Sequence, residues 1–208
     1  RDARGARPRG RRRARRARGR PRRVPRARAH APGRGEEAEA GVDASDIRGI
    51  LDVHYAAVHG EPIDYYDEDV LDDWSPPVTD ERVANFAQRP QRQEEVVRVA
   101  EMDNAVVGFG ILVPRLSEIR ACYVLPRLAR QGIGVALLSE LERLAGQAGL
   151  DWLNLNAALN AEPFYLANGY VADGLGKQLL PGGREMSCVR MYKFLVSESS
   201  KWSRGIVP

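Results

Sequence analysis

The sequence predicts an α/β fold, built as one domain behind an Arg-rich N-terminal arm. Residues 118–124 mix β-branched and aromatic side chains and are closed by Pro126, which is typical of a strand. After this strand, apolar residues recur at the spacing of one helix face, at Ile133, Leu137, Leu138, Leu141, Leu144 and Ala145. Residues 36–208 are long enough to bury a full core as a single domain.

The charge of the chain is divided between two unlike parts. The 208 residues carry a formal net charge of +4, but residues 1–35 alone hold 16 Arg and one Asp, a net charge of +15. The remaining residues contain 16 basic and 27 acidic side chains, a net charge of −11. The folded part is therefore expected to be acidic, and the basic character belongs to the arm.

Residues 1–41 are predicted to be disordered, because residues 1–35 contain one Val and no other large apolar side chain. Three interpretations of this arm stay open. It is a polybasic segment that binds nucleic acid, which the acidic domain alone is not expected to do. It is an Arg-rich targeting segment, although it lacks an amphipathic apolar face. Or it is translated GC-rich DNA, since it is mostly Arg, Ala, Gly and Pro and position 1 is not Met.

Three helices and a hairpin are predicted between the arm and the strand at 118–124. The helices are expected at 46–59, 67–74 and 79–88, the last of them capped by Thr79. Strands at 95–101 and 105–113 are joined by Met102-Asp103-Asn104, a hairpin turn signal. Trp74, at the end of the acidic second helix, is expected to anchor the core.

The loop between the strand at 118–124 and the following helix predicts an anion site. First-turn amide groups of a helix lack intrahelical partners, and the positive end of the helix dipole lies there. Gly132 and Gly134 would let a phosphate approach the backbone. A Walker loop is excluded because Val135 and Ala136 follow Gly134, and a dinucleotide fingerprint is excluded because position 137 is Leu.

Two segments of the sequence carry a resemblance to a known family. The run from Ala129 to Gly134 resembles the acyl-CoA pyrophosphate loop of the GNAT superfamily of N-acyltransferases, Q/R-x-x-G-x-G/A, with Ala129 in place of Gln or Arg. The second GNAT signature, A-x-x-F-Y-x-x-x-G-F/Y, is similar to residues 161–170, and the matching positions are Ala161, Phe164, Tyr165, Gly169 and Tyr170. Many members carry Asn at the position of Ala158, where this chain offers Asn160.

The resemblance covers roughly residues 43–194 and implies the GNAT fold. That fold has a central mixed, largely antiparallel sheet with a splayed parallel strand pair and flanking helices. We therefore expect a GNAT domain at 42–196 and a flexible tail at 197–208. The splayed strands would be the one ending at Val124 and the one at 152–156. GNAT domains usually begin with a strand before the first helix, and residues 36–42 contain no convincing one.

The resemblance also implies an N-acetyltransferase that uses acetyl-CoA without a metal. Tyr165 is the expected acid that protonates the leaving thiolate, and Glu118 is the candidate base. Two alternatives stay open: ordered water acts as the base, or Glu118 is a strand carboxylate paired with Arg120 or another cation. CoA is expected on the strand main chain, on the glycine loop and at one further Asn. These predicted contacts are Cys122, Tyr123, Val124, Arg130, Gln131, Gly132, Ile133, Gly134, Val135 and Asn160.

The acceptor is expected to be an unidentified primary amine on a small molecule or a peptide. The acidic domain mildly favours cationic acceptors such as polyamines, aminoglycosides or Lys-bearing peptides, and Tyr65 and Tyr66 fall in a region that often borders the acceptor site of GNAT enzymes. A catalytically silent acyl-CoA-binding module is the alternative function. Cys122 and Cys188 are expected to be buried and reduced in a cytoplasmic protein that does not enter a membrane, either monomeric or homodimeric.

Overall fold

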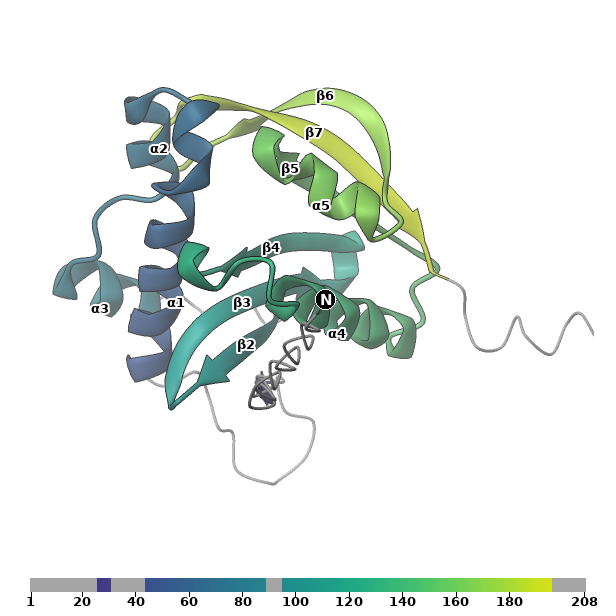
Figure 1. Ribbon diagram of the computed structural model, residues 1–208, viewed down its shortest axis with the longest axis horizontal. Coiled ribbons are helices and arrows are strands. Elements are labelled where there is room, and N and C mark those ends of the chain that lie inside the picture. Colours follow the sequence, from purple (N-terminus) through teal and green to yellow (C-terminus); the bar gives the residue numbers. More distant parts are fainter. Residues whose placement is uncertain (1–25, 31–43, 89–94, 196–208) are drawn as a thin grey trace, which may run out of the picture.

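A computed structural model describes residues 26–30, 44–88 and 95–195, and these form one sheet with helices on both faces (Figure 1). The sheet has seven strands in the order β1-β2-β3-β4-β5-β7-β6. Their bounds are Arg26–His30, Val96–Met102, Ala105–Val113, Glu118–Val124, Trp152–Ala158, Val171–Leu179 and Glu185–Phe194 for β1 to β7. Every neighbouring pair is antiparallel except β4 and β5, which are parallel. The mixed, largely antiparallel sheet predicted from the sequence is confirmed.

Strand β1 corrects one expectation about the arm. Residues Arg26–His30 pair with β2 in an antiparallel register from Arg26↔Glu101 to His30↔Val97, although disorder was predicted for all of 1–41. An edge strand is joined to its neighbour through main-chain hydrogen bonds, so it forms without large apolar side chains. It provides the strand before the first helix that GNAT domains usually have, which was not found in the sequence of residues 36–42. The rest of the arm and the tail at 197–208 lie outside the described residues.

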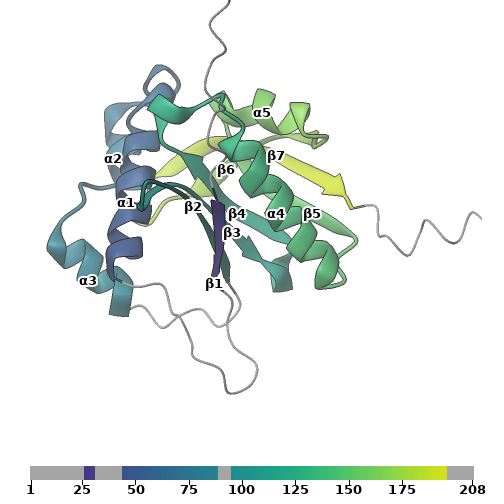
Figure 2. The ribbon, with the colours of Figure 1, turned by 60° about the horizontal axis from the view of Figure 1, so that its bottom comes forward.

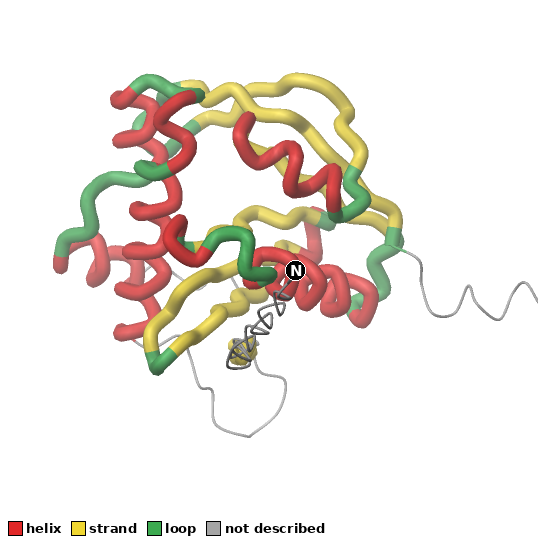
Figure 3. Tube along the Cα trace, viewed as in Figure 1, coloured by secondary structure: helices red, strands yellow, loops and turns green. Residues whose placement is uncertain are grey.

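Helices cover the two faces of the sheet as separate groups (Figure 2). One group consists of α1 (Ala44–Val58), the short helix η1 (Glu61–Asp64), α2 (Glu68–Trp74) and α3 (Asp80–Gln88). The other group consists of α4 (Ile133–Gln147) and α5 (Glu162–Ala167). Short 3₁₀ turns precede β4, α4 and α5, at Pro114–Leu116 (η2), Pro126–Leu128 (η3) and Leu159–Ala161 (η4). Figure 3 shows how loops connect these layers. In the described parts of the chain, no helix is both long and apolar enough to cross a bilayer.

Helix α4 packs closely on β3 because two glycines of that strand face it. A Cβ at Gly108 would lie 3.1 Å from Leu137 Cδ1, and one at Gly110 would lie 2.8 Å from Leu141 Cδ1. These leucines are 1% and 0% exposed, so little room is left for a side chain between strand and helix. Tight packing of this kind leaves few voids and fixes the helix against the sheet. The position of the α4 N-terminus is therefore set by the core.

Strands β4 and β5 part soon after they meet. Their only paired position among the described residues is Glu118↔Asn154. Asn154 holds this end closed, because its main-chain N–H donates to the Ser117 carbonyl at 2.8 Å and its side-chain amide donates to the same oxygen at 2.8 Å. Beyond this pair the strands diverge, as the resemblance predicted. The sheet therefore opens toward Val124 and Ala158, at the ends of the two strands.

Candidate active site

A cavity of about 430 Å³ lies where β4 and β5 part. Its walls come from the end of β4, the loop before α4, the segment that leads into α5, and the ends of α1 and α2. Nine of the twelve residues predicted from the sequence line it: Cys122, Tyr123, Val124, Arg130, Gly132, Gly134, Val135, Asn160 and Tyr165. The structure therefore gathers most of the predicted site around one opening.

The main chain of β4 presents hydrogen-bonding groups to this opening. Leu125 N–H donates to Val107 O at 2.9 Å, and the register places Tyr123 opposite Phe109 of β3. Because an antiparallel ladder alternates the side on which main-chain groups point, Tyr123 also bonds toward β3, and Cys122 and Val124 point toward β5. Since β5 has already diverged, the N–H and C=O groups of Cys122 and Val124 face the cavity.

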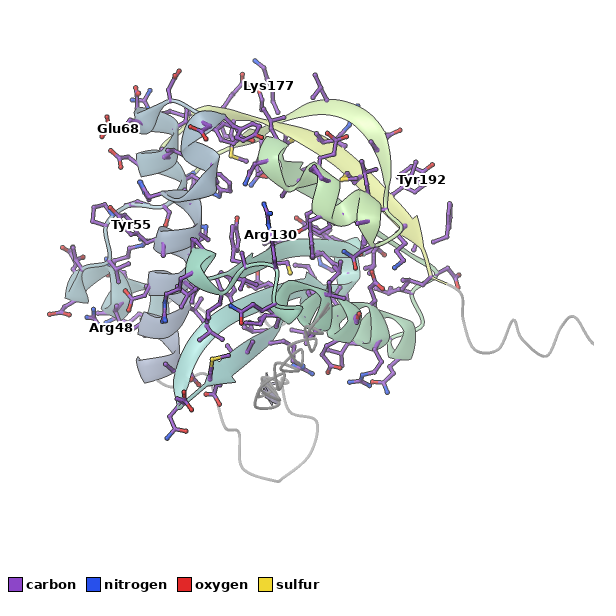
Figure 4. The ribbon with its side chains drawn as sticks, in the orientation of Figure 1. Arg48, Tyr55, Glu68, Arg130, Lys177 and Tyr192 are labelled. Carbon is purple, nitrogen blue, oxygen red and sulfur yellow. The ribbon has the colours of Figure 1, made fainter. Side chains whose placement is uncertain are left out.

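The N-terminus of α4 forms the second wall. Gly132 precedes the helix with φ +87°, a left-handed conformation that glycine adopts without strain, and no side chain caps the helix. The N–H groups of the first helical residues therefore have no intrahelical partner and carry the positive end of the helix dipole. Figure 4 shows the Arg130 side chain rising from this loop toward α5. This arrangement is suited to hold a phosphate.

The segment leading into α5 supplies the third wall and an unsatisfied acceptor. Asn160 lines the cavity, and its side-chain oxygen Oδ1 is buried without a hydrogen-bond partner. A buried polar atom without a partner costs free energy, and such atoms are rare in folded proteins. A ligand N–H in the cavity would satisfy it. Phe164 lies over the α4 N-terminus, since a Cβ at Gly134 would be 3.4 Å from its ring.

Two protic side chains in the cavity are held neutral by burial. Tyr165 of α5 is 7% exposed, and burial raises its pKa well above 10, with smaller contributions from Cys122 and Tyr123. Burial also raises the pKa of the Cys122 thiol to about 12, and its Sγ lies 3.9 Å from the Gly134 carbonyl oxygen. At neutral pH both therefore keep their protons, and Tyr165 can act as a hydrogen-bond or proton donor.

The structure does not bring the remaining predicted residues to the cavity. Glu118 starts β4, about 13 Å before Cys122 at the rise of a strand. Its carboxylate lies 2.9 Å from Arg120, which also pairs with Glu95. Gln131 is exposed beside the loop, and the Ile133 side chain is 2% exposed in the core against Leu137, so only its main chain remains available to a ligand.

A second hollow, of about 550 Å³, is lined by residues of β5, β6 and β7. Trp152 and Phe194 border it, together with Asp173 and Arg190, whose side chains are 3.9 Å apart. It contains none of the predicted site residues and no buried acid, base or thiol. The cavity between β4 and β5 is therefore the candidate active site.

Comparison with known proteins agrees with this geometry. A sequence model of the acetyltransferase (GNAT) domain matches residues 63–180, more than half of the chain. The chain belongs to the GNAT acetyltransferase family. The match includes the glycine loop before α4 and the whole second signature at 161–170, and it leaves out α1 and β7. A search of curated protein sequences found no match.

Solved GNAT structures share the fold. A GCN5-related N-acetyltransferase from Rhodopseudomonas palustris is 25% identical, with a TM-score of 0.67, over 83% of this chain and 96% of that one. The PaiA N-acetyltransferase of Thermoplasma acidophilum, solved with coenzyme A, is 16% identical, with a TM-score of 0.57, over 82% and 99%. The putative acetyltransferase YncA of Salmonella typhimurium, solved with acetyl-CoA, is 20% identical, with a TM-score of 0.55, over 89% and 98%.

Sequence reasoning missed one wall of this GNAT site. Trp74 was expected in the core, but it lines the cavity with Ala57 and Pro62. It ends α2, and its ring lies 6.3 Å from Tyr123 of β4 and 5.7 Å from Tyr66, measured between centroids. A Trp at a helix end is compatible with either a core or a cavity position. The neighbouring pair Tyr65-Tyr66 was the available signal, because that region often borders the acceptor site.

Proposed function

We propose that this GNAT domain transfers an acetyl group from acetyl-CoA to a primary amine by direct attack. One observation carries the proposal: β4 and β5 pair at a single position, Glu118↔Asn154, and their open end lies beside the uncapped N-terminus of α4. An opening of this kind accepts a chain with amide groups at one end and phosphates at the other. The coenzyme complexes of the Thermoplasma and Salmonella proteins support the same ligand class.

The residues present fit acetyl-CoA at three places. The first-turn N–H groups of residues 133–135, with the positive charge of Arg130, would hold the pyrophosphate. The main-chain groups of Cys122 and Val124 would pair with the pantetheine amides, as a neighbouring strand would. The orphaned Oδ1 of Asn160 would accept a ligand N–H. When bound, acetyl-CoA supplies a thioester carbonyl as electrophile and a thiolate as leaving group.

Tyr165 is the proposed acid of the reaction. The amine lone pair forms the new C–N bond, the C–S bond breaks with its electron pair on sulfur, and sulfur takes a proton from the Tyr165 hydroxyl. The nitrogen releases its extra proton to water, which also restores Tyr165. Burial keeps this phenol protonated at neutral pH, so the donor stays loaded until the C–S bond breaks. Proton transfer to a thiolate of conjugate-acid pKa about 8.5 is uphill for the phenol, and it is completed when the proton released from nitrogen restores Tyr165.

Two measurements on the full chain test this function. Titration calorimetry reports acetyl-CoA binding, and thiol release followed with DTNB reports turnover on a panel of amines. Tyr165→Phe should lower kcat by about 10²- to 10⁴-fold, the usual contribution of general acid–base catalysis, and leave acetyl-CoA affinity within a few-fold. If affinity is lost instead, Tyr165 has a structural role. Binding without turnover on any amine would favour the catalytically silent module.

Tyr170→Phe is a matched control for this test. Tyr170 is also a buried tyrosine, 2% exposed, and its ring centroid lies 5.6 Å from that of Tyr165. It does not line the cavity. Removing its hydroxyl changes the same aromatic cluster without changing the proposed donor. The control should therefore keep kcat, and an equal loss in both variants would show that packing, rather than proton donation, explains the effect.

A further inference from the structure

The wall of the cavity on the side of α1 and α2 is aromatic and uncharged. Trp74 and Tyr123 form it together with Ala57 and Pro62, and Tyr165 lies across the opening on α5. The Tyr123 ring is stacked on Phe109 at 5.3 Å between centroids, and the His54 ring meets it edge-on at 4.7 Å. Because these neighbours fix the orientation of Tyr123, the wall is preformed, and its Trp74 and Tyr123 rings meet at an angle of 62°.

Tyr66 holds this wall in place from behind. Its hydroxyl donates to the Ser187 carbonyl at 2.8 Å and accepts from the Leu159 N–H at 2.8 Å. These two bonds tie the segment before α2 to the ends of β5 and β7 across the opening. The Tyr66 ring meets Trp74 edge-on at 5.7 Å. Trp74 is therefore supported by a ring that does not itself line the cavity.

The acidic residues of α2 are directed elsewhere. Asp73 accepts hydrogen bonds from the N–H groups of Gly182 and Arg184, and Asp69 pairs with the Arg184 side chain at 3.1 Å. Asp72 lies 4.0 Å from His59, and Figure 4 shows Glu68 on the outer side of the helix. Helix α2 thus supplies Trp74 to the cavity, while these four carboxylates lie along its other sides.

No carboxylate is found among the described residues that line the cavity. Arg130, at the phosphate end, is the one lining side chain with a formal charge. An ammonium group that enters the aromatic end would lose its hydration without gaining an acidic partner. A cation gains only a modest attraction over an aromatic face, whichever amine carries it, whereas an amine on a flat apolar body gains in addition the burial of that body against the two rings.

From this wall we infer that the acceptor is a primary amine carried on a flat, apolar body, rather than a polyamine, an aminoglycoside or a lysine side chain. The inference rests on the proposed function for its chemistry, and the covalent step is the one given above. It replaces the mild expectation of a cationic acceptor, which came from the net charge of the domain. The aromatic ring of the acceptor would lie in the corner between the Trp74 and Tyr123 rings.

An amine panel on the full chain tests the inference. With acetyl-CoA saturating, kcat/KM should be about 10- to 100-fold higher for 2-phenylethylamine than for spermidine, kanamycin or a lysine peptide, the range over which an apolar pocket discriminates. Trp74→Ala should reduce the value for 2-phenylethylamine about 10-fold, and Trp74→Phe should restore most of it. Unchanged acetyl-CoA binding shows that each variant is folded. Preference for spermidine, kanamycin or the peptide overturns the inference.

A separate binding measurement distinguishes failure of the inference from failure of the proposed function. Calorimetric titration of the same amines into the CoA-saturated protein requires no turnover. If 2-phenylethylamine binds more tightly than spermidine and no amine is acetylated, the aromatic subsite stands and the proposed function fails. If spermidine binds more tightly, or if no amine binds and turnover shows no preference for 2-phenylethylamine, the aromatic subsite is refuted.

Discussion

His54 makes a sharp prediction about how the stability of the fold depends on pH. Its Nδ1 lies 3.0 Å from the hydroxyl of Ser75, which is fully buried, and its ring packs against Tyr123 and Trp74. The pKa of His54 is lowered from 6.5 to about 4, first by burial and then by the positive charges of Arg82 and His59. The folded state therefore holds a neutral histidine that the unfolded chain protonates more readily.

The size of the effect follows from the two pKa values. The difference between 6.5 and about 4 corresponds to about 3 kcal/mol at 1.36 kcal/mol per pKa unit. Because the folded-state pKa is depressed, this stabilisation is fully present above pH 6.5 and is lost as the pH falls toward 4. Between pH 7 and pH 5 the loss is about 2 kcal/mol, or about 4–8 °C in Tm for a domain of this size.

Urea unfolding of the wild type and of His54→Gln, at pH 7 and at pH 5, isolates this contribution. Glutamine keeps a polar partner for Ser75 but does not titrate, so the variant should lose about 2 kcal/mol less than the wild type between the two pH values. The carboxylates of the domain titrate in both proteins, and their effect cancels in the comparison. Parallel losses in the two proteins would refute the assignment of the pH dependence to His54.

Two further variants test the candidate site. Gly134→Leu should abolish measurable acetyl-CoA binding in calorimetry, because a side chain there enters the phosphate cradle beside Phe164. The control Gly146→Leu, near the far end of the same helix where a side chain meets open space, should keep the affinity. Equal affinities in the two variants would show that the N-terminus of α4 is not part of the CoA site. Glu118→Gln should change kcat less than about 3-fold and lower the free energy of unfolding in urea by about 0.5–1 kcal/mol, the value of a partly exposed ion pair. A fall in kcat of about 10²-fold would instead show that Glu118 is the catalytic base.

The sequence was most informative where local chemistry decides the structure. The hairpin between β2 and β3 turns at Asp103 and Asn104, both with positive φ (51° and 63°), as a two-residue turn requires. The helix after Gly132 follows from its apolar stripe, and the glycine loop before it was placed correctly by the same pattern. These features depend on residues close together in the chain, so periodicity and turn chemistry were sufficient to predict them.

What the sequence could not provide depends on contacts between distant segments. The Arg-rich strand β1 is placed by main-chain pairing with β2, which leaves no apolar pattern to detect. Trp74 reaches the cavity only because α2 ends beside β4, and the Tyr66 hydroxyl bonds to residues 93 and 121 positions away. The ion pair of Glu118 with Arg120 was one of the alternatives taken from the sequence and is confirmed, whereas the place of Glu118 at the closed end of the splay came from the fold.

The one departure in the glycine loop, Ala129, is consistent with how the loop is held. The turn before it is closed by main-chain bonds, from Leu128 N–H to Leu125 O at 2.9 Å and from Ala129 N–H to Pro126 O at 3.0 Å. Arg130 then adopts φ +59°, a left-handed conformation that costs a non-glycine residue about 1–2 kcal/mol, and Gly132 adopts φ +87°. No step of this path uses the side chain at position 129. A Gln or Arg there would add a ligand contact, whereas the shape of the cradle comes from the backbone and from the packing of α4 on β3.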